Sequence, residues 1–188
     1  REICGVGGLM DWNPDFRKIG MEGLMLLVNG PDEARSAVRK LVKDGEAMKR
    51  FGNTMVAWDV KAMKPQKVFS VPGAPLEIRW AWGEKHNYAF TSTALGSKLW
   101  LCYEDQNGAW QAKETAAIGG AGGVLPVDIS LSADDRTLFV DCFGDGKCRV
   151  FDVSDPFHPK PISEAAIGRQ LNMVSQSWDG KRLYFSSS

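Results

Sequence analysis

"SADDRTLFV" (Ser132–Val140) returns 45 positions later as "SWDGKRLYF" (Ser177–Phe185). Both copies begin with a serine, pass through a polar turn and end in an apolar run that is typical of a strand. A looser copy, "WGEKHNYAF", begins at Trp82. Self-similarity at a fixed period indicates that one short structural unit is used several times along the chain.

A second series has nearly the same period. "AWD" at Ala57, "CYE" at Cys102 and "VFD" at Val150 are separated by 45 and 48 residues. A period of this length, made of short strands and tight turns, is typical of a β-propeller blade of about four strands. The sequence therefore predicts a mainly β fold, a partial β-propeller of two and a half to three blades. Complete propellers have about four to eight blades, so we expect the chain to fold poorly without the rest of the ring.

The first 50 residues differ from the rest of the chain. Asn29-Gly30-Pro31-Asp32 is a helix start signal, and Gly45 supplies a stop. Between them, apolar residues recur with helical spacing and form one stripe: Ala34, Ala37, Val38, Leu41 and Val42. The predicted domains are a short α-helical N-terminal segment (1–50) and the propeller blades (51–188). After Phe51, the one stretch that permits a helical turn is Glu164–Ala166.

Composition excludes several classes of protein. Lysine and arginine number 23, as do aspartate and glutamate, so the formal net charge is zero and no general attraction to nucleic acid or anionic lipid is expected. The longest apolar run, Leu24–Val28, is too short to span a bilayer. No signal-peptide pattern opens the chain. The sequence begins at Arg1 and stops within a strand-like run, so we expect a piece of a longer protein.

The stretch "DCFGDGKC" (Asp141–Cys148) combines two thiols, two carboxylates and two glycines. A calcium loop would use Asp141, Asp145 and Asp152 at its first, fifth and twelfth positions, but its third position is Phe143 and no helices flank it. A redox pair requires both thiols on one face, which a three-residue turn would produce and a two-residue turn would not. We interpret the stretch as a hairpin turn and its cysteines as small apolar fillers.

Other candidate motifs are weak. His86 and His158 lie in segments that resemble surface turns, where a histidine is usually solvated and only sometimes a metal ligand. "GGAGG" (Gly119–Gly123) lacks the strand, helix and Lys-Ser/Thr context of a phosphate loop, so we interpret it as a linker between blades. No CxxC pair, HExxH motif or Ser/His/Asp arrangement is present.

The inner strands give the candidate site. "PLEIR" (Pro75–Arg79), "PVDIS" (Pro126–Ser130) and "LNMVS" (Leu171–Ser175) occupy equivalent places in the repeat. Inner strands line a propeller's channel, so Glu77, Arg79 and Asp128 are the channel-lining candidates. They have two interpretations: charge pairing between neighbouring blades, or a channel mouth that positions a substrate or a shell of metal ligands.

These segments, with "EAMKRFGNTMVAWDV" (Glu46–Val60) and "FDVSDP" (Phe151–Pro156), resemble the selenium-binding protein family, whose bacterial members include methanethiol oxidases. The resemblance runs from about Glu46 to Ser188. It implies a seven-bladed propeller and, for the full-length protein, a copper-dependent oxidoreductase that converts methanethiol, oxygen and water into formaldehyde, hydrogen sulfide and hydrogen peroxide. The implied partners are a small thiol substrate and the remaining blades, with neither nucleic acid nor a membrane.

The resemblance also implies where chemistry is missing. The family's histidine motifs contain HH, DIH or AHE, and none of these occurs in the sequence, so we assign no metal ligand and expect the copper ligands outside this chain. The segment is expected to be scaffold and channel wall, inactive alone. Bacterial oxidases of the family are periplasmic and animal relatives are cytoplasmic, which leaves both compartments open.

Two alternatives remain. One is a non-catalytic propeller that binds a partner or a selenium or sulfur species. The other rests on residues 1–45, where "NGPDEARSAVRKLVKDG" (Asn29–Gly45) resembles imidazolonepropionase-like amidohydrolases without their catalytic HxH motif. A gene fusion or assembly join near Gly45–Met48 would explain both halves, and so would a variable insertion in an oxidase.

Overall fold

The fold consists of strands arranged in four antiparallel sheets. The computed structural model describes residues 2–5, 52–83, 86–120 and 123–187. The predicted N-terminal helix and the boundary at residue 50 lie outside these ranges and stay predictions. The strands are β1 (Glu2–Gly5), β2 (Thr54–Asp59), β3 (Lys64–Ser70), β4 (Pro75–Trp80), β5 (Tyr88–Thr93), β6 (Lys98–Glu104), β7 (Trp110–Ala117), β8 (Pro126–Leu131), β9 (Thr137–Cys142), β10 (Lys147–Asp152), β11 (Lys160–Ala166), β12 (Leu171–Gln176) and β13 (Leu183–Ser187).

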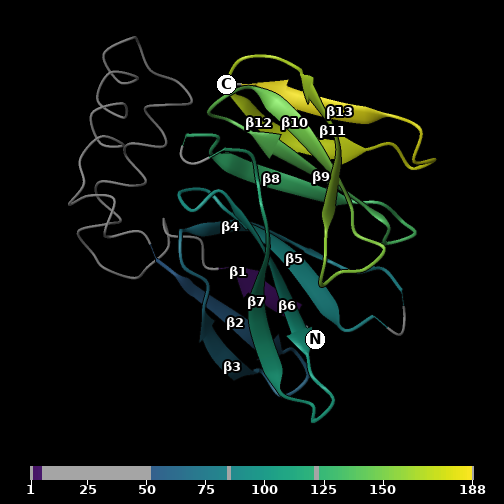
Figure 1. Cartoon of the computed structure of the whole chain (residues 1–188). Coiled ribbons are helices and arrows are strands. Elements are labelled where there is room, and N and C mark those ends of the chain that lie inside the picture. Colours follow the sequence, from purple (N-terminus) through teal and green to yellow (C-terminus); the bar gives the residue numbers. More distant parts are fainter. Residues whose placement is uncertain (1, 6–51, 84–85, 121–122, 188) are drawn as a thin grey trace.

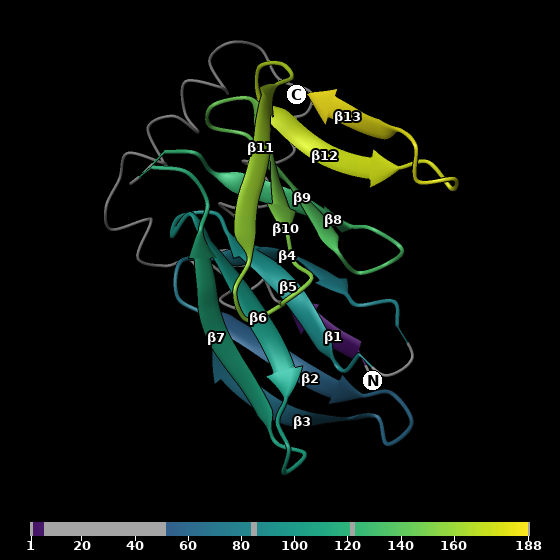
Figure 2. The ribbon, with the colours of Figure 1, turned by 45° about the vertical axis from the view of Figure 1, so that its right-hand side comes forward.

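Each sheet is formed by strands that follow one another closely in the chain, except that β1 and β2 are separated by residues 6–53. The orders are β1-β2-β3, β4-β5-β6-β7, β8-β9-β10-β11 and β12-β13. The sheets follow one another in space in sequence order, and β4 and β12 both contact β8 (Figures 1 and 2). Two four-stranded sheets flanked by two incomplete ones confirm the predicted partial propeller.

The repeated sequence forms the same turn twice. The Ser132 hydroxyl donates to Asp134 Oδ1 at 2.6 Å, and the Ser177 hydroxyl donates to Asp179 Oδ1 at 2.6 Å. The next residue is left-handed in both copies, with φ of 57° at Asp135 and 67° at Gly180. Asp and Gly are among the residues that tolerate this conformation best, so the two copies specify one turn with different side chains.

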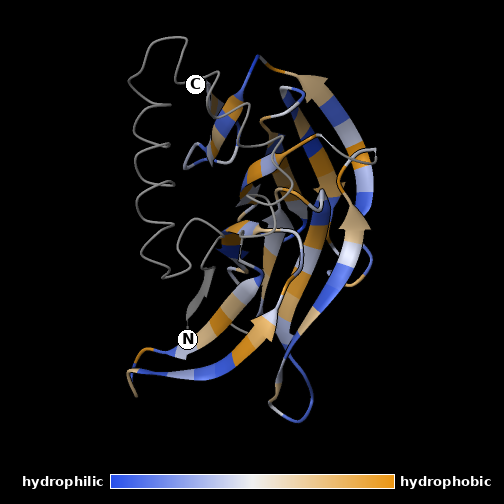
Figure 3. Ribbon diagram, turned by 90° about the vertical axis from the view of Figure 1, so that its left-hand side faces the viewer, coloured by the Kyte–Doolittle hydropathy of each residue, from blue (hydrophilic) through white to orange (hydrophobic). Residues whose placement is uncertain are grey.

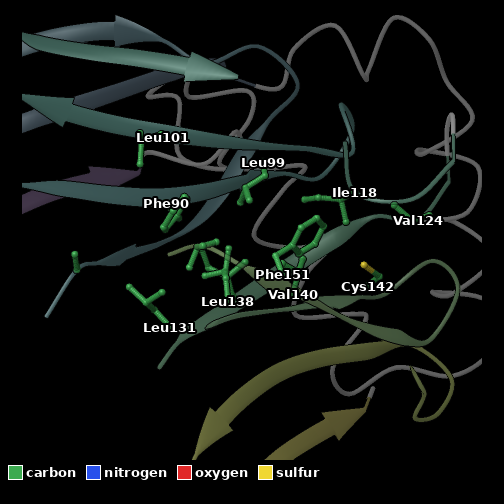
Figure 4. Close-up of a cluster of buried hydrophobic side chains, with 13 residues drawn as sticks. Phe90, Leu99, Leu101, Ile118, Val124, Leu131, Leu138, Val140, Cys142 and Phe151 are labelled. Atoms are coloured by element: carbon green, nitrogen blue, oxygen red, sulfur yellow. The ribbon is translucent and has the colours of Figure 1, made fainter. Parts of the chain in front are cut away.

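The main core lies between the two complete sheets. Apolar and polar residues alternate along much of the strands other than β7 and β11 (Figure 3), and alternation of this kind gathers apolar side chains on one face of a sheet. Phe90 and Leu99 of one sheet point toward Leu138 and Phe151 of the next (Figure 4), and all four are essentially inaccessible to solvent.

One sequence prediction was wrong. Glu164–Ala166, the stretch that permitted a helical turn, belongs to strand β11, where Glu164 lies opposite Arg149 of β10. The Lys147 ammonium also donates to Glu164 Oε1 at 2.6 Å. Pairing with β10 therefore outweighs the local helix preference of glutamate and alanine.

Two of the outer strands, β3 and β11, share a feature that protects the edge of a sheet. Each begins with Lys-Pro, Lys64-Pro65 and Lys160-Pro161. The ladder is irregular at each proline, between Ala57 and Trp58 and between Val150 and Phe151. Lysine and proline on an outer strand discourage pairing with another chain, because proline cannot donate and lysine resists burial.

The core between the sheets generates a stability prediction. Leu138→Ala should lower the free energy of unfolding by about 2–5 kcal/mol, since Leu138 is fully buried there. Ile162→Ala is the matched control, because Ile162 is 59% exposed and its truncation should cost less than about 0.5 kcal/mol. Urea unfolding of both variants measures the difference. Equal losses would contradict this packing.

Candidate functional site

The three predicted site residues lie together on the inner strands. Glu77 and Arg79 belong to β4 and Asp128 belongs to β8. The Arg79 guanidinium donates from Nη1 to Glu77 Oε1 and from Nη2 to Asp128 Oδ1, the latter at 3.2 Å. The structure therefore joins the three candidates in one charge cluster that bridges two sheets.

Asp128 extends this cluster to a third sheet. Its side chain is 1% exposed, and its Oδ2 accepts a hydrogen bond from the backbone N–H of Val174 on β12 at 2.8 Å. Its Oδ1 also accepts from the Ile129 N–H at 2.9 Å. A buried carboxylate is stable only when donors compensate its lost hydration, and here donors from three consecutive sheets do so. Charge pairing between blades, one of the two interpretations of these residues, is thus present in the structure.

A second buried carboxyl group, that of Asp141, accepts a hydrogen bond from the backbone of Asp128. Asp141 Oδ1 accepts from the Asp128 N–H at 2.8 Å, where the β8–β9 ladder is irregular and the amide would otherwise lack a partner. Asp141 Oδ2 has no hydrogen-bond partner among the described residues. Burial, together with the nearby charge of Asp128, raises the pKa of Asp141 to about 7. Sequence patterns suggested only a calcium-ligand role for Asp141, and nothing in them marks its contact with the Asp128 amide.

The stretch Asp141–Cys148 is a hairpin connection, as predicted. Four residues, 143–146, join β9 to β10, and Cys142 lies opposite Lys147 while Cys148 lies opposite Asp141. The two free thiols therefore lie on opposite faces of the sheet, which rules out a disulfide between them.

Burial also makes both thiols of the hairpin unreactive. Burial raises the pKa of Cys142 to about 12 and that of Cys148 to about 11. They are thus protonated at neutral pH, and a protonated thiol is a poor nucleophile and metal ligand.

The other carboxylates of the candidate calcium loop accept hydrogen bonds from neighbouring residues. Asp145 Oδ2 accepts from Arg149 Nη2 at 2.5 Å, and Asp152 Oδ1 accepts from the Ser154 N–H at 2.9 Å. Gly144 is required for a different reason, because a Cβ there would lie 1.9 Å from the Gly123 carbonyl oxygen in the linker between sheets. The stretch is therefore a packing element.

The two histidines are held by separate carboxylates. His86 Nδ1 lies 2.7 Å from Asp135 Oδ2, and His158 Nδ1 lies 2.8 Å from Asp155 Oδ2. Asp135 also accepts from the Trp82 and Gly83 N–H groups at 2.7 and 2.8 Å, so it fastens the β4–β5 connection to the next sheet. Within the described ranges, no three His, Cys, Asp or Glu side chains are grouped to hold a metal ion.

A cleft opens beside the charge cluster. It has a volume of about 520 Å³ and lies between the inner strands of three sheets. Its lining includes Arg79, Trp82, Leu131, Gln176 and Trp178.

In the part of the chain that the structure describes, no helix is long and apolar enough to cross a membrane.

The charge cluster generates a mutational prediction. Asp128→Asn should lower the free energy of unfolding by about 2–4 kcal/mol, because an amide has one acceptor oxygen for three donors and no charge opposite Arg79. Glu77→Gln should cost less than about 1 kcal/mol, since Glu77 is 32% exposed and water replaces its contact. Chemical denaturation distinguishes them, and similar losses would refute the special role of Asp128.

Asp141 generates a pH prediction. Its pKa of about 7 in the folded state exceeds the ordinary aspartate value of about 3.9, so the folded state holds a proton that the unfolded state has released. Stability is therefore highest at acidic pH from this group and falls as pH rises, by roughly 2 kcal/mol between pH 5 and pH 7. Asp141→Asn should flatten this decline.

Asp179→Asn is the control for that measurement. Hydrogen bonds from Ser177 and Lys181 lower the pKa of the exposed Asp179, so its titration lies below the pH window. Denaturation midpoints between pH 5 and pH 8 should keep the wild-type slope in this variant. An unchanged slope in Asp141→Asn would show that Asp141 is not the titrating group.

Comparisons with known proteins agree with this fold and extend it. The chain is 62% identical over 150 residues to a methanethiol oxidase from Ruegeria pomeroyi, and the match covers 79% of this chain and 34% of the relative. A methanethiol oxidase from Hyphomicrobium sp. is 57% identical over 150 residues with the same coverage. The chain thus spans about a third of the length of these curated relatives.

Solved structures support the fold alone. A hypothetical selenium-binding protein from Sulfolobus tokodaii superposes with a TM-score of 0.68 at 23% identity, covering 76% of this chain and 40% of that one. The β-propeller domain of Cps50 (Swd1) from Myceliophteria thermophila has a TM-score of 0.56 at 11% identity, covering 72% and 42%. The likeness to the Cps50 domain supports a propeller arrangement of the sheets.

The sequence model of the 56 kDa selenium-binding protein family matches residues 39–188. The match begins at Arg39, a little before the Glu46 expected from sequence, and residues 1–38 lie outside it. The amidohydrolase resemblance of residues 1–45 stays a prediction. The inner-strand repeat, the packed sheets and this match over most of the chain lead to one conclusion: the chain belongs to the 56 kDa selenium-binding protein family.

Proposed function

We propose that this chain is part of a copper-dependent methanethiol oxidase. The reaction consumes methanethiol, oxygen and water and yields formaldehyde, hydrogen sulfide and hydrogen peroxide. The observation that carries the proposal is the identity of 57–62% to two methanethiol oxidases across 150 residues. Identity at this level over the scaffold of a site supports a shared activity, although fold alone does not.

The described residues do not fit a copper site. Copper in proteins takes imidazole or thiolate ligands, and several must converge. Within the described ranges, no three His, Cys, Asp or Glu side chains are grouped to hold a metal ion, and His86 and His158 have separate aspartate partners. Burial keeps the thiols of Cys102, Cys142 and Cys148 protonated at neutral pH. We therefore place the ligands outside these residues and assign no chemical step to the residues described.

The role of the described segment is to build the wall of the channel. Asp128 fixes three inner strands relative to one another, and Asp135 fastens the β4–β5 connection to the β8–β9 turn. A rigid wall of this kind holds groups contributed by other blades at constant separation, which metal and substrate sites require. The partners are a small thiol and the remaining blades, in the periplasm of a bacterium or, alternatively, in the cytoplasm.

A second candidate is a non-catalytic propeller that binds selenium or sulfur species. The name of the matching family supports it. The buried, protonated state of the described cysteines weighs against selenium capture by these residues.

A segment exchange tests the proposal. Residues 39–188 replace the matching 150 residues of the Ruegeria pomeroyi methanethiol oxidase, giving a hybrid protein with all the relative's other segments. The hybrid should bind copper and produce hydrogen peroxide when methanethiol is added, while the 188-residue chain alone should do neither.

The relative itself is the positive control, and a hybrid carrying Leu138→Ala is the control for loss of folding. Methanethiol-dependent peroxide from the 188-residue chain would show that the ligands lie within it. A folded, copper-loaded hybrid without activity would contradict the proposed function.

A further inference from the structure

A second groove lies between the two complete sheets, on the side of their outer strands. It has a volume of about 450 Å³, which is within the range of small-molecule sites. One wall is the end of β7 with the segment after it, and the other wall is formed by β10 and β11. Both walls belong to four-stranded sheets, so the groove does not depend on the two-stranded β12–β13 sheet.

A buried guanidinium with one unused donor lines this groove. The Arg149 side chain is 9% exposed, and its Nη1 and Nη2 donate to Oδ1 and Oδ2 of Asp145 at 3.2 and 2.5 Å. The Arg149 Nε–H has no hydrogen-bond partner among the described residues. A buried donor without a partner costs free energy, which an acceptor placed beside it would recover.

The missing side chain of Gly119 leaves space for an oxygen at this donor. A Cβ on residue 119 would lie 3.1 Å from both Nε and Nη2 of Arg149. That point is therefore at hydrogen-bond distance from both nitrogens of one guanidinium edge, a position that suits a carboxylate oxygen. Val124 Cγ1 lies 3.0 Å from the same point and closes its far side. We call this point the acceptor position.

The charges around the groove are balanced, which disfavours a simple anion. Asp145 opposes the charge of Arg149. Lys147 Nζ donates to Glu164 Oε1 at 2.6 Å, so this second cation is paired as well. Glu164 Oε2 lies 3.6 Å from Arg149 Nε and would repel an added negative charge. A ligand that carries its own positive charge avoids this repulsion.

An α-amino acid has the required charge pattern. Its ammonium and carboxylate are attached to one carbon, and the acceptor position and Glu164 Oε2 lie 3.1 and 3.6 Å from the same Arg149 Nε. Glu164 is 52% exposed, so its carboxylate has room to turn toward an ammonium. The apolar part of the lining, Ala117, Phe151 and Pro161, suits a small aliphatic side chain.

We propose that this groove binds small aliphatic α-amino acids as zwitterions, with the carboxylate at Arg149 Nε and the ammonium at Glu164. The proposal is independent of the proposed oxidase activity, because the groove lies at the outer strands while the charge cluster lies on the inner strands β4 and β8. The bound amino acid would contact both complete sheets and should therefore stabilise their association by mass action.

The preceding sheet offers a matched comparison. Lys98 Nζ donates to Glu114 Oε1 at 2.8 Å, as Lys147 does to Glu164 in the next sheet. Trp100 lies opposite Glu114, whereas a guanidinium lies opposite Glu164. The same lysine–glutamate pair thus occurs without the arginine, so Glu114→Gln is the control for Glu164→Gln.

Equilibrium dialysis with radiolabelled L-leucine tests the proposal. It is carried out on the 188-residue chain and on the hybrid protein, and circular dichroism checks the folding of each sample. Leucine should bind saturably in the millimolar range. 4-Methylpentanoate, which lacks the ammonium, and 3-methylbutylamine, which lacks the carboxylate, should each bind at least about tenfold less tightly.

Variants of the hybrid separate this groove from other binding surfaces. Glu164→Gln should weaken leucine binding several-fold and strengthen 4-methylpentanoate binding, because it removes a charge that attracts an ammonium and repels a carboxylate. Glu114→Gln should change neither. Gly119→Ala should abolish saturable binding, because its Cβ occupies the acceptor position. Residue 119 has a φ of 76°, so Glu164→Gln decides the test if the alanine variant does not fold.

Three results would overturn the proposal. They are no saturable binding of leucine to the folded hybrid at tens of millimolar, leucine binding that survives Gly119→Ala in folded protein, and equal effects of the two Glu→Gln substitutions. In the first case water satisfies the Arg149 Nε–H. A hybrid that makes peroxide without binding leucine would refute the groove alone, and leucine binding without peroxide would leave the groove in place and refute the oxidase.

Discussion

The structure depends on one buried carboxylate. The Asp128 carboxylate accepts hydrogen bonds from Arg79 on β4, from the Ile129 N–H on its own strand and from the Val174 N–H on β12. The inner strands of three consecutive sheets therefore meet at a single side chain. Removing a carboxylate from water is costly, and only this complete set of donors offsets the cost. These hydrogen bonds fix the relative positions of the inner strands. The positions of the charge cluster and of the cleft beside it depend on them.

Most of the architecture could be predicted because it depends on local sequence patterns. The repeated turn, the apolar strands and the hairpin at Asp141–Cys148 all follow from residue types at fixed spacing. Strands β7 and β11 were not predicted, since they are outer strands whose exposed faces, such as "KPISEAA", lack apolar alternation. Glu164–Ala166 favours a helix locally, and only its pairing with β10 reveals a strand.

The candidate site shows the same division. Glu77, Arg79 and Asp128 could be found because the repeat places them on inner strands. Their partners could not: the Val174 N–H is a backbone group that no sequence pattern marks, and Asp141 reaches the Asp128 amide only because the β8–β9 ladder is irregular there. The described residues thus supply a rigid wall with an aromatic cleft, while their histidines and thiols are bound or buried.

Amide hydrogen exchange at Val174 tests the central role of Asp128 most directly. If Asp128 Oδ2 accepts this N–H, the amide should be as well protected as the ladder amides of β9, and Asp128→Asn should reduce its protection far more than theirs. Fast exchange of the Val174 amide in the unmodified protein, or protection that survives Asp128→Asn, would show that the three inner strands are held together by other means.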